Sequence, residues 1–125
     1  MPPDERIDQV PSERPSLGAE WDGPWGSIAP VPHSIETLCI RIEKEAGNPC
    51  IFYYPYRTIG HWNWSMDANE TLEIKAASVQ VVISGSGLRR LAEALNMGQL
   101  RLVQSSPIPG GEEEIIIRSI LIEEG

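Results

Sequence analysis

The chain has 125 residues, of which 41% are hydrophobic, and a formal net charge of −8. A chain of this length forms one domain with a real core, and it contains no apolar run of the roughly 18–20 residues that a membrane span requires. Nucleic-acid binding normally depends on a basic patch, and the sequence shows none. We therefore expect neither a membrane nor a nucleic acid among the partners.

The acidic residues are concentrated toward the two ends of the chain. Residues 1–34 carry six acids and two bases, residues 106–125 carry five acids and one base, and residues 35–105 carry seven of each. Acidic flanks either solvate a protein or attract a basic protein partner. The same partition divides the single expected domain into a Pro-rich acidic arm (1–34), a β core with one helix (35–105), and a linker with a C-terminal strand (106–125).

The first residues lack the basic and then apolar segments of a secretory signal, which predicts a cytoplasmic protein. In a reducing compartment Cys39 and Cys50 would be free thiols, although the two could also pair across a hairpin.

The N-terminal arm contains seven of the eleven prolines and no sustained periodicity, so we expect it to be extended. Within it, "EWDGPWG" places Trp21 and Trp25 four residues apart around a Gly-Pro turn. Tryptophans commonly anchor interfaces. These two predict that the arm lies on its own core or on a neighbouring chain.

Short strands with period-two alternation follow from Ile35 onward, separated by the turn segments "EAGNP" and "MDANE". The segment 86–97 predicts one helix, because Leu88, Leu91, Ala92 and Leu95 form an apolar stripe. Ser86 is its expected N-cap and Gly98 its expected C′ residue. The fold class is therefore mainly β (α+β), a small, strongly bent antiparallel sheet or β-barrel with one helix.

The segment "FYYPYRTIGHWNW", Phe52–Trp64, holds six of the eight aromatic residues. Its alternation favours core and sheet surface, with Phe52, Tyr54, Trp62 and Trp64 on one side. The opposite side would then present a candidate surface or ligand site of Tyr53, Tyr56, Arg57 and His61.

No motif predicts catalysis, a metal or another cofactor. The spacing of the residues that could ligate a metal matches no metal-binding motif. These residues are His33, His61, Cys39, Cys50, Asp67 and Glu70. The "SGSG" segment at Ser84–Gly87 resembles a nucleophile elbow only superficially, because glycines directly flank Ser86. The helix N-terminus that follows, near Arg89 and Arg90, is an alternative anion site.

The C-terminal strand "IIIRSILIEE" carries apolar residues on both faces, which predicts that both faces are covered. A small sheet with one helix has few side chains left to cover the second face of this strand. We therefore expect a second chain there, either a copy of this one or another protein. The expected interface residues are Trp21, Trp25, Ile115, Ile117, Ile120 and Ile122.

The pattern "L.I…YPYR.I…W…LEI…V.I.G.GL..L…L..G.L.LV", over roughly residues 36–104, resembles small bacterial domains of about five bent strands and a helix. At the level of fold it is similar to Sm-like small β-barrels. The resemblance implies assembly into rings or dimers through edge strands. It carries over no RNA site, because the RNA-contacting segments of Sm proteins are not recognisable and the helix lies late in the chain.

The leading functional hypothesis is a non-enzymatic protein interaction or assembly module. One alternative is an acidic inhibitor or immunity-type protein that binds a basic partner. The other is a small ligand-binding barrel or enzyme centred on His61.

Overall fold

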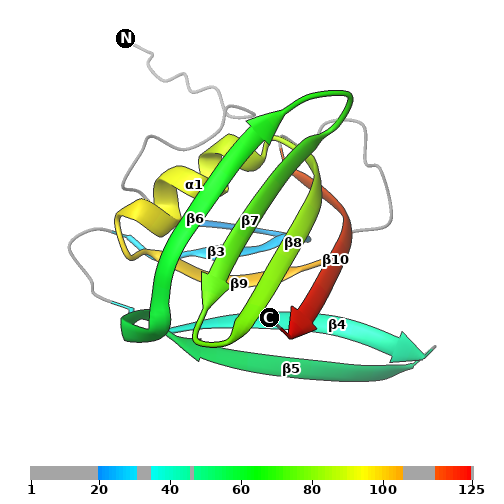
Figure 1. Cartoon of the computed structure of the whole chain (residues 1–125), viewed down its shortest axis with the longest axis horizontal. Helices are drawn as coiled ribbons and strands as arrows, with labels where there is room; N and C mark the ends of the chain where they lie inside the picture. Colours follow the sequence, from blue (N-terminus) through cyan, green and yellow to red (C-terminus); the bar gives the residue numbers. More distant parts are fainter. Residues whose placement is uncertain (1–19, 31–34, 46, 106–114, 125) are drawn as a thin grey trace, which may run out of the picture.

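The computed structural model describes residues 20–30, 35–45, 47–105 and 115–124, and in this part of the chain the strands form two sheets around one α-helix (Figure 1). One sheet has the order β10–β8–β7–β6 and the other the order β2–β3–β9–β4–β5. The expected mainly β (α+β) class with one helix is confirmed. The elements are β2 (Trp21–Gly23), β3 (Gly26–Ile28), β4 (Thr37–Glu45), β5 (Asn48–Pro55), η2 (Tyr56–Thr58), β6 (Ile59–Met66), β7 (Glu70–Ala76), β8 (Val79–Ser86), α1 (Leu88–Asn96), β9 (Leu100–Gln104) and β10 (Ile116–Glu124).

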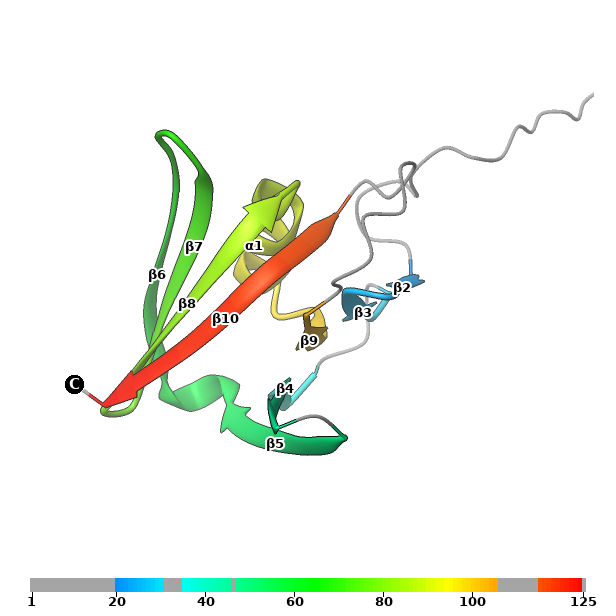
Figure 2. The ribbon, with the colours of Figure 1, turned by 90° about the vertical axis from the view of Figure 1, so that its right-hand side faces the viewer.

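All described strand pairs are antiparallel except β4–β9, which is parallel. A parallel pair needs a long crossover connection, and the elements from β5 to α1 supply it. No described strand pair joins the two sheets, so they do not close into a barrel. The chain passes from one sheet to the other at the corner between β5 and β6, where η2 makes the turn (Figure 2).

The hydrophobic core lies between the two sheets and α1, which packs on the inner side of the four-stranded sheet (Figure 2). Inward residues of β7 and β8 alternate with outward ones, which are polar except for Val82. None of the helices in the described ranges has the length and apolar character needed to cross a bilayer. The largest fully buried side chains are those of Trp25, Leu38, Ile40, Leu72, Ile74, Ile83, Leu88, Leu91, Leu95, Leu100, Ile115 and Ile117.

A bulge in β10 explains why the C-terminal strand looked apolar on both faces. Ile117 pairs with Gly85 and Ser119 with Ser84, so Arg118 is an extra residue without a register partner on β8. An extra residue shifts the side-chain alternation by one. Ile115, Ile117, Ile120 and Ile122 therefore all pack against the core of the same chain. The outer face carries Leu121, 53% exposed.

The described part of the predicted arm lies on the core of its own chain. Trp21–Gly23 and Gly26–Ile28 form a hairpin that joins the five-stranded sheet through β9. Trp25, in the turn, is 0% exposed, and its ring meets that of Trp21 edge-on at 5.4 Å. The amide N–H of Gln104 donates to the Trp25 carbonyl oxygen at 2.8 Å and fixes the turn against the end of β9. Residues 1–19 lie outside the described ranges.

The N-terminus of α1 is capped by a carboxylate from β7. The amides of Gly87, Leu88 and Arg89 donate to the carboxylate oxygens of Glu70 over 2.8, 2.9 and 3.2 Å. The Trp64 indole N–H also donates to Glu70, at 2.8 Å. A carboxylate satisfies free amides of a first turn and complements the helix dipole. The expected Ser86 cap is therefore wrong, and the position proposed for an external anion is filled by the protein itself.

Candidate functional site

A row of outward-facing side chains crosses the whole five-stranded sheet. Asp22 of β2 lies opposite Ser27 of β3, and Ser27 lies opposite Leu102 of β9. Leu102 is the register partner of Cys39 on β4, which in turn pairs with Tyr53 on β5. Neighbouring strands lie about 4.8 Å apart, so these five residues, the cross-strand row, span roughly 19 Å.

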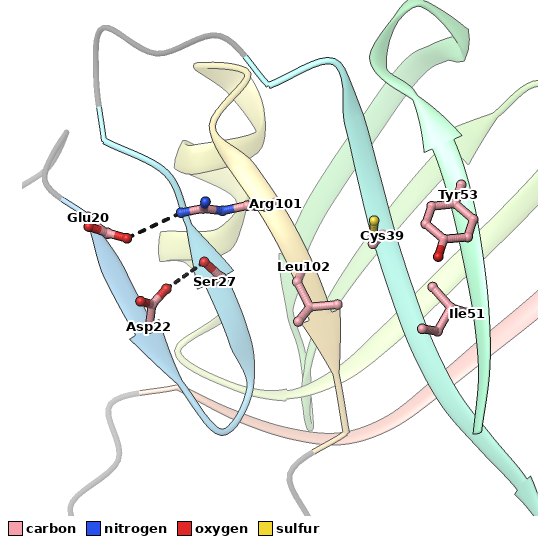
Figure 3. A pocket seen from close by; sticks show the side chains of 8 residues that line it. All are labelled: Glu20, Asp22, Ser27, Cys39, Ile51, Tyr53, Arg101 and Leu102. Carbon is pink, nitrogen blue, oxygen red and sulfur yellow. Dashed lines mark hydrogen bonds and ion pairs between the residues drawn. The ribbon is translucent and has the colours of Figure 1, made fainter. Parts of the chain in front are cut away.

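The cross-strand row lines an open depression of about 390 Å³ (Figure 3). Its β5 end is apolar, since the Tyr53 side chain is 64% exposed and that of Ile51 is 44% exposed. Its β2 end is acidic and carries Glu20 and Asp22. Exposed aromatic and aliphatic side chains beside charged groups are typical of a surface that another macromolecule covers.

The polar groups at the acidic end are held in place by short-range contacts. Ser27 Oγ donates to an Asp22 carboxylate oxygen at 2.6 Å, and an Arg101 guanidinium nitrogen lies 3.5 Å from a carboxylate oxygen of Glu20 (Figure 3). Arg101 neutralises only one of these two carboxylates. The acidic end therefore keeps a net negative charge that a basic group on a partner can meet.

Cys39 contributes the one thiol among the residues that line the depression. Burial raises the pKa of the Cys39 thiol above its ordinary value, which keeps the thiol protonated and weakly nucleophilic at neutral pH. None of the residues that line it is a histidine. Among the described residues, which do not include His33, no group of three or more His, Cys, Asp or Glu side chains is placed to hold a metal ion.

The structure does not bring together the four residues of the predicted aromatic site. Tyr53 lies on the outer face of the five-stranded sheet, whereas His61 lies exposed on the outer face of the other sheet, opposite Lys75. Arg57 is exposed in η2. Tyr56 packs against the core, because η2 interrupts the strand alternation and turns its ring inward. Only Tyr53 contributes to the depression.

Tyr56 has a structural role that can be measured. Its hydroxyl donates to the Leu100 carbonyl oxygen at 2.7 Å. Burial raises the pKa of Tyr56 well above its ordinary value. The folded state therefore keeps the phenol protonated at a pH where the unfolded chain releases the proton.

We expect Tyr56→Phe to cost about 0.5–1.5 kcal/mol of unfolding free energy at neutral pH, through loss of one hydrogen bond. The raised pKa stabilises the native protein fully below about pH 10, the unfolded value, and this stabilisation is lost as the pH rises toward the folded value. Urea unfolding measures the free energy of unfolding at about pH 8 and pH 11, and its decrease between the two should be smaller for Tyr56→Phe than for the wild type. An equal decrease in both proteins would refute the raised pKa of Tyr56.

The proposed interface residues divide by accessibility. Trp25, Ile115 and Ile117 are 0% exposed, so they stabilise the chain's own core and are not open to a partner. Trp21, Ile120 and Ile122 are partly buried against the same core. Cys39 and Cys50 are free thiols on opposite faces of the β4–β5 pair, because Cys39 faces outward while Cys50 lies opposite the inward Ile42.

A second depression, of about 490 Å³, lies between β6 and α1. Trp64 contributes from β6, and the remaining lining residues come from α1 and its C-terminal end. The Arg89 guanidinium carbon lies 5.7 Å from the centre of the Trp64 ring. We call this depression the helix–strand groove; it is lined by Trp64, Arg89, Ala92, Glu93, Asn96 and Met97.

Sequence reasoning did not find the cross-strand row. Alternation alone places Cys39 and Tyr53 on the outer face, but it gives no reason to put Leu102 beside them. That contact depends on the parallel β4–β9 pair, whose two strands are about sixty residues apart in the chain.

Comparison with protein-family models, with curated proteins and with solved structures gave no match for this chain.

Proposed function

We propose that the chain is a non-enzymatic protein-binding module that docks its partner on the outer face of the five-stranded sheet. The cross-strand row carries this proposal, because it combines exposed apolar side chains at Tyr53 and Ile51 with the carboxylates of Glu20 and Asp22. The partner that fits presents an apolar side chain toward Tyr53 and a basic group roughly 19 Å away, toward Asp22.

An acidic inhibitor is a special case of the same proposal. The net charge of −8 and the acidic end of the row favour a partner with a basic functional surface, which such a protein would mask. The two versions differ in the effect on the partner. An inhibitor abolishes the partner's own activity at stoichiometric ratio, whereas an assembly module leaves it intact.

We place this function in the cytoplasm, in keeping with the two free thiols. The alternative of a ligand site or enzyme centred on His61 gains no support from the geometry. His61 is exposed, faces Lys75 and lines neither of the two depressions described above.

The test uses the immobilised chain to capture partners from its native host, followed by titration of the captured protein after purification. We expect Tyr53→Ala to weaken binding by about 2 kcal/mol or roughly 30-fold in Kd, the effect of truncating a hot-spot aromatic. The matched control is Leu121→Ala, a 53% exposed side chain on the outer face of the other sheet and away from the β6 edge. Binding that is unchanged by Tyr53→Ala, or lost with Leu121→Ala, would place the partner elsewhere.

A further inference from the structure

We propose that two copies of this chain pair through the free edge of β6 and join their four-stranded sheets into one continuous antiparallel sheet. One edge of β6 is bonded to β7, and no described strand pairs with the other edge (Figure 1). An edge strand presents backbone N–H and C=O groups that can bond to another strand. The proposal concerns a different sheet from the cross-strand row and does not depend on it.

The other three sheet edges of the described structure carry features that oppose pairing. β2 is three residues long, and β5 contains Pro49 near its start and Pro55 at its end. β10 is bulged at Arg118 and ends in two glutamates. Short edges, prolines, bulges and charges all discourage edge-to-edge contact.

The β6 edge carries none of these features over six residues. From His61 to Met66 the strand pairs with β7 in unbroken register, and it contains no proline, carboxylate, lysine or arginine. The irregularity in β6 lies before this stretch, between Ile59 and His61. A long, regular and uncharged edge lacks the features by which natural proteins discourage pairing, so it can act as a template for another strand.

The helix–strand groove lies beside this same edge. In Figure 1, α1 passes behind β6 and extends beyond it, so a strand added to β6 would continue the sheet over the helix. Inward side chains of that strand would enter the groove between Trp64 and Met97. Met97 is 37% exposed, and covering it would add apolar burial to the backbone bonds of the new strand pair.

The charge distribution favours a second copy of this chain over an acidic or basic partner. Two chains with a net charge of −8 repel each other, so they associate best through surfaces that are locally neutral. The edge from His61 to Met66 carries no formal charge, and the groove contains one base, Arg89, and one acid, Glu93, 3.9 Å apart. A two-fold axis can bring each of these side chains near its opposite on the partner, which makes the surface self-complementary.

Side-chain alternation restricts the register. Inward residues must face inward residues across an antiparallel pair, so a two-fold axis must pass through a residue and not between two residues. An axis at Asn63 pairs the regular stretch His61–Ser65 with its copy. It places Trp62 beside the partner's Trp64.

The first experiment measures the mass of the wild-type chain by light scattering from low to high micromolar concentration. We expect twice the chain mass of 13.9 kDa. Asn63→Lys puts two lysines opposite each other at the axis, so the mass should fall to that of one chain while circular dichroism stays unchanged. The matched control is Ser119→Lys, an exposed position on the opposite edge strand, β10, which should remain dimeric.

The second experiment tests the register. Asn63→Cys should form a disulfide-linked dimer under mild oxidation, because residues on the axis face their own copies. The wild type, with its native Cys39 and Cys50, and Ser119→Cys should not. A wild-type chain that stays monomeric at high micromolar concentration, or a dimer lost with Ser119→Lys and kept with Asn63→Lys, would overturn the proposal. Neither of these two results would contradict the proposed partner surface on the five-stranded sheet.

Discussion

Glu70→Ala should lower the free energy of unfolding by about 3–5 kcal/mol, because each buried donor left without an acceptor costs about 1–3 kcal/mol and water can reach some of them. The carboxylate accepts from the amides of Gly87, Leu88 and Arg89 and from the Trp64 indole. Removing it also deletes the charge at the helix N-terminus. Urea unfolding followed by circular dichroism measures the loss.

Two further variants separate the cap from the charge. Glu70→Gln keeps one acceptor oxygen at the helix and should cost less than Glu70→Ala, by about 1–2 kcal/mol. Glu73→Ala removes a carboxylate from the outer face of the same strand, where it accepts a 3.4 Å bond from Gln80. Its effect should stay within about 0.5 kcal/mol. A loss at Glu73 as large as that at Glu70 would contradict the capping role.

Glu70 also shows what the sequence does not reveal. In "MDANETLEI" it is one acid at the start of a strand, and nothing local distinguishes it from the other carboxylates of an acidic chain. Its role depends on β7 and β8 pairing so that Glu70 lies opposite Gly85, three residues before the helix start at Leu88. Without that register, the sequence gives no reason to pair residues that are seventeen to nineteen positions apart.

The sequence of the C-terminal strand is also compatible with a bulge. Ile115 and Ile117 alternate in one phase and Ile120 and Ile122 in the other, with the change at Arg118 and Ser119. Two alternations out of phase by one residue indicate a bulge as well as they indicate a strand buried on both faces. Gly85, opposite Ile117, supports the bulge: a Cβ there would lie 1.9 Å from the Ile116 carbonyl oxygen.

Local patterns predicted the elements well, because alternation and the helical stripe are set by neighbouring residues. The β4–β5 hairpin, the β7–β8 pair and the helix all follow from such patterns. The candidate surface does not, since it needs strands that are far apart in the chain, such as β3 and β9, side by side. Asp22 and Tyr53 share one face only because β3, β9 and β4 join their strands into one sheet.

The proposed dimer would change how the partner surface acts. Each paired molecule would carry two cross-strand rows on one rigid body. A partner with two matching sites would then bind the second row at high effective concentration, and its avidity would exceed the affinity of either site alone. Asn63→Lys should remove this gain while leaving the affinity of a single row unchanged.

Trp25→Ala should be the most damaging change at the N-terminal hairpin, with a loss of about 3–5 kcal/mol in unfolding free energy. The side chain is 0% exposed, and its ring packs edge-on against Trp21 and beneath Gly23, where a Cβ would lie 2.5 Å from the indole nitrogen. Its removal leaves a cavity under β2 and β3 that the short hairpin cannot fill by collapsing. Guanidinium unfolding monitored by far-ultraviolet circular dichroism measures the effect.

Trp25→Phe is the informative comparison. The Trp25 indole nitrogen is buried without a hydrogen-bond partner among the described residues, so phenylalanine keeps most of the apolar volume and removes an unsatisfied donor. Its loss should be less than half that of Trp25→Ala. Because β2 carries Asp22, a hairpin released by Trp25→Ala should also weaken partner binding at the acidic end of the row. If Trp25→Ala leaves both stability and partner binding unchanged, the hairpin does not hold this end of the surface.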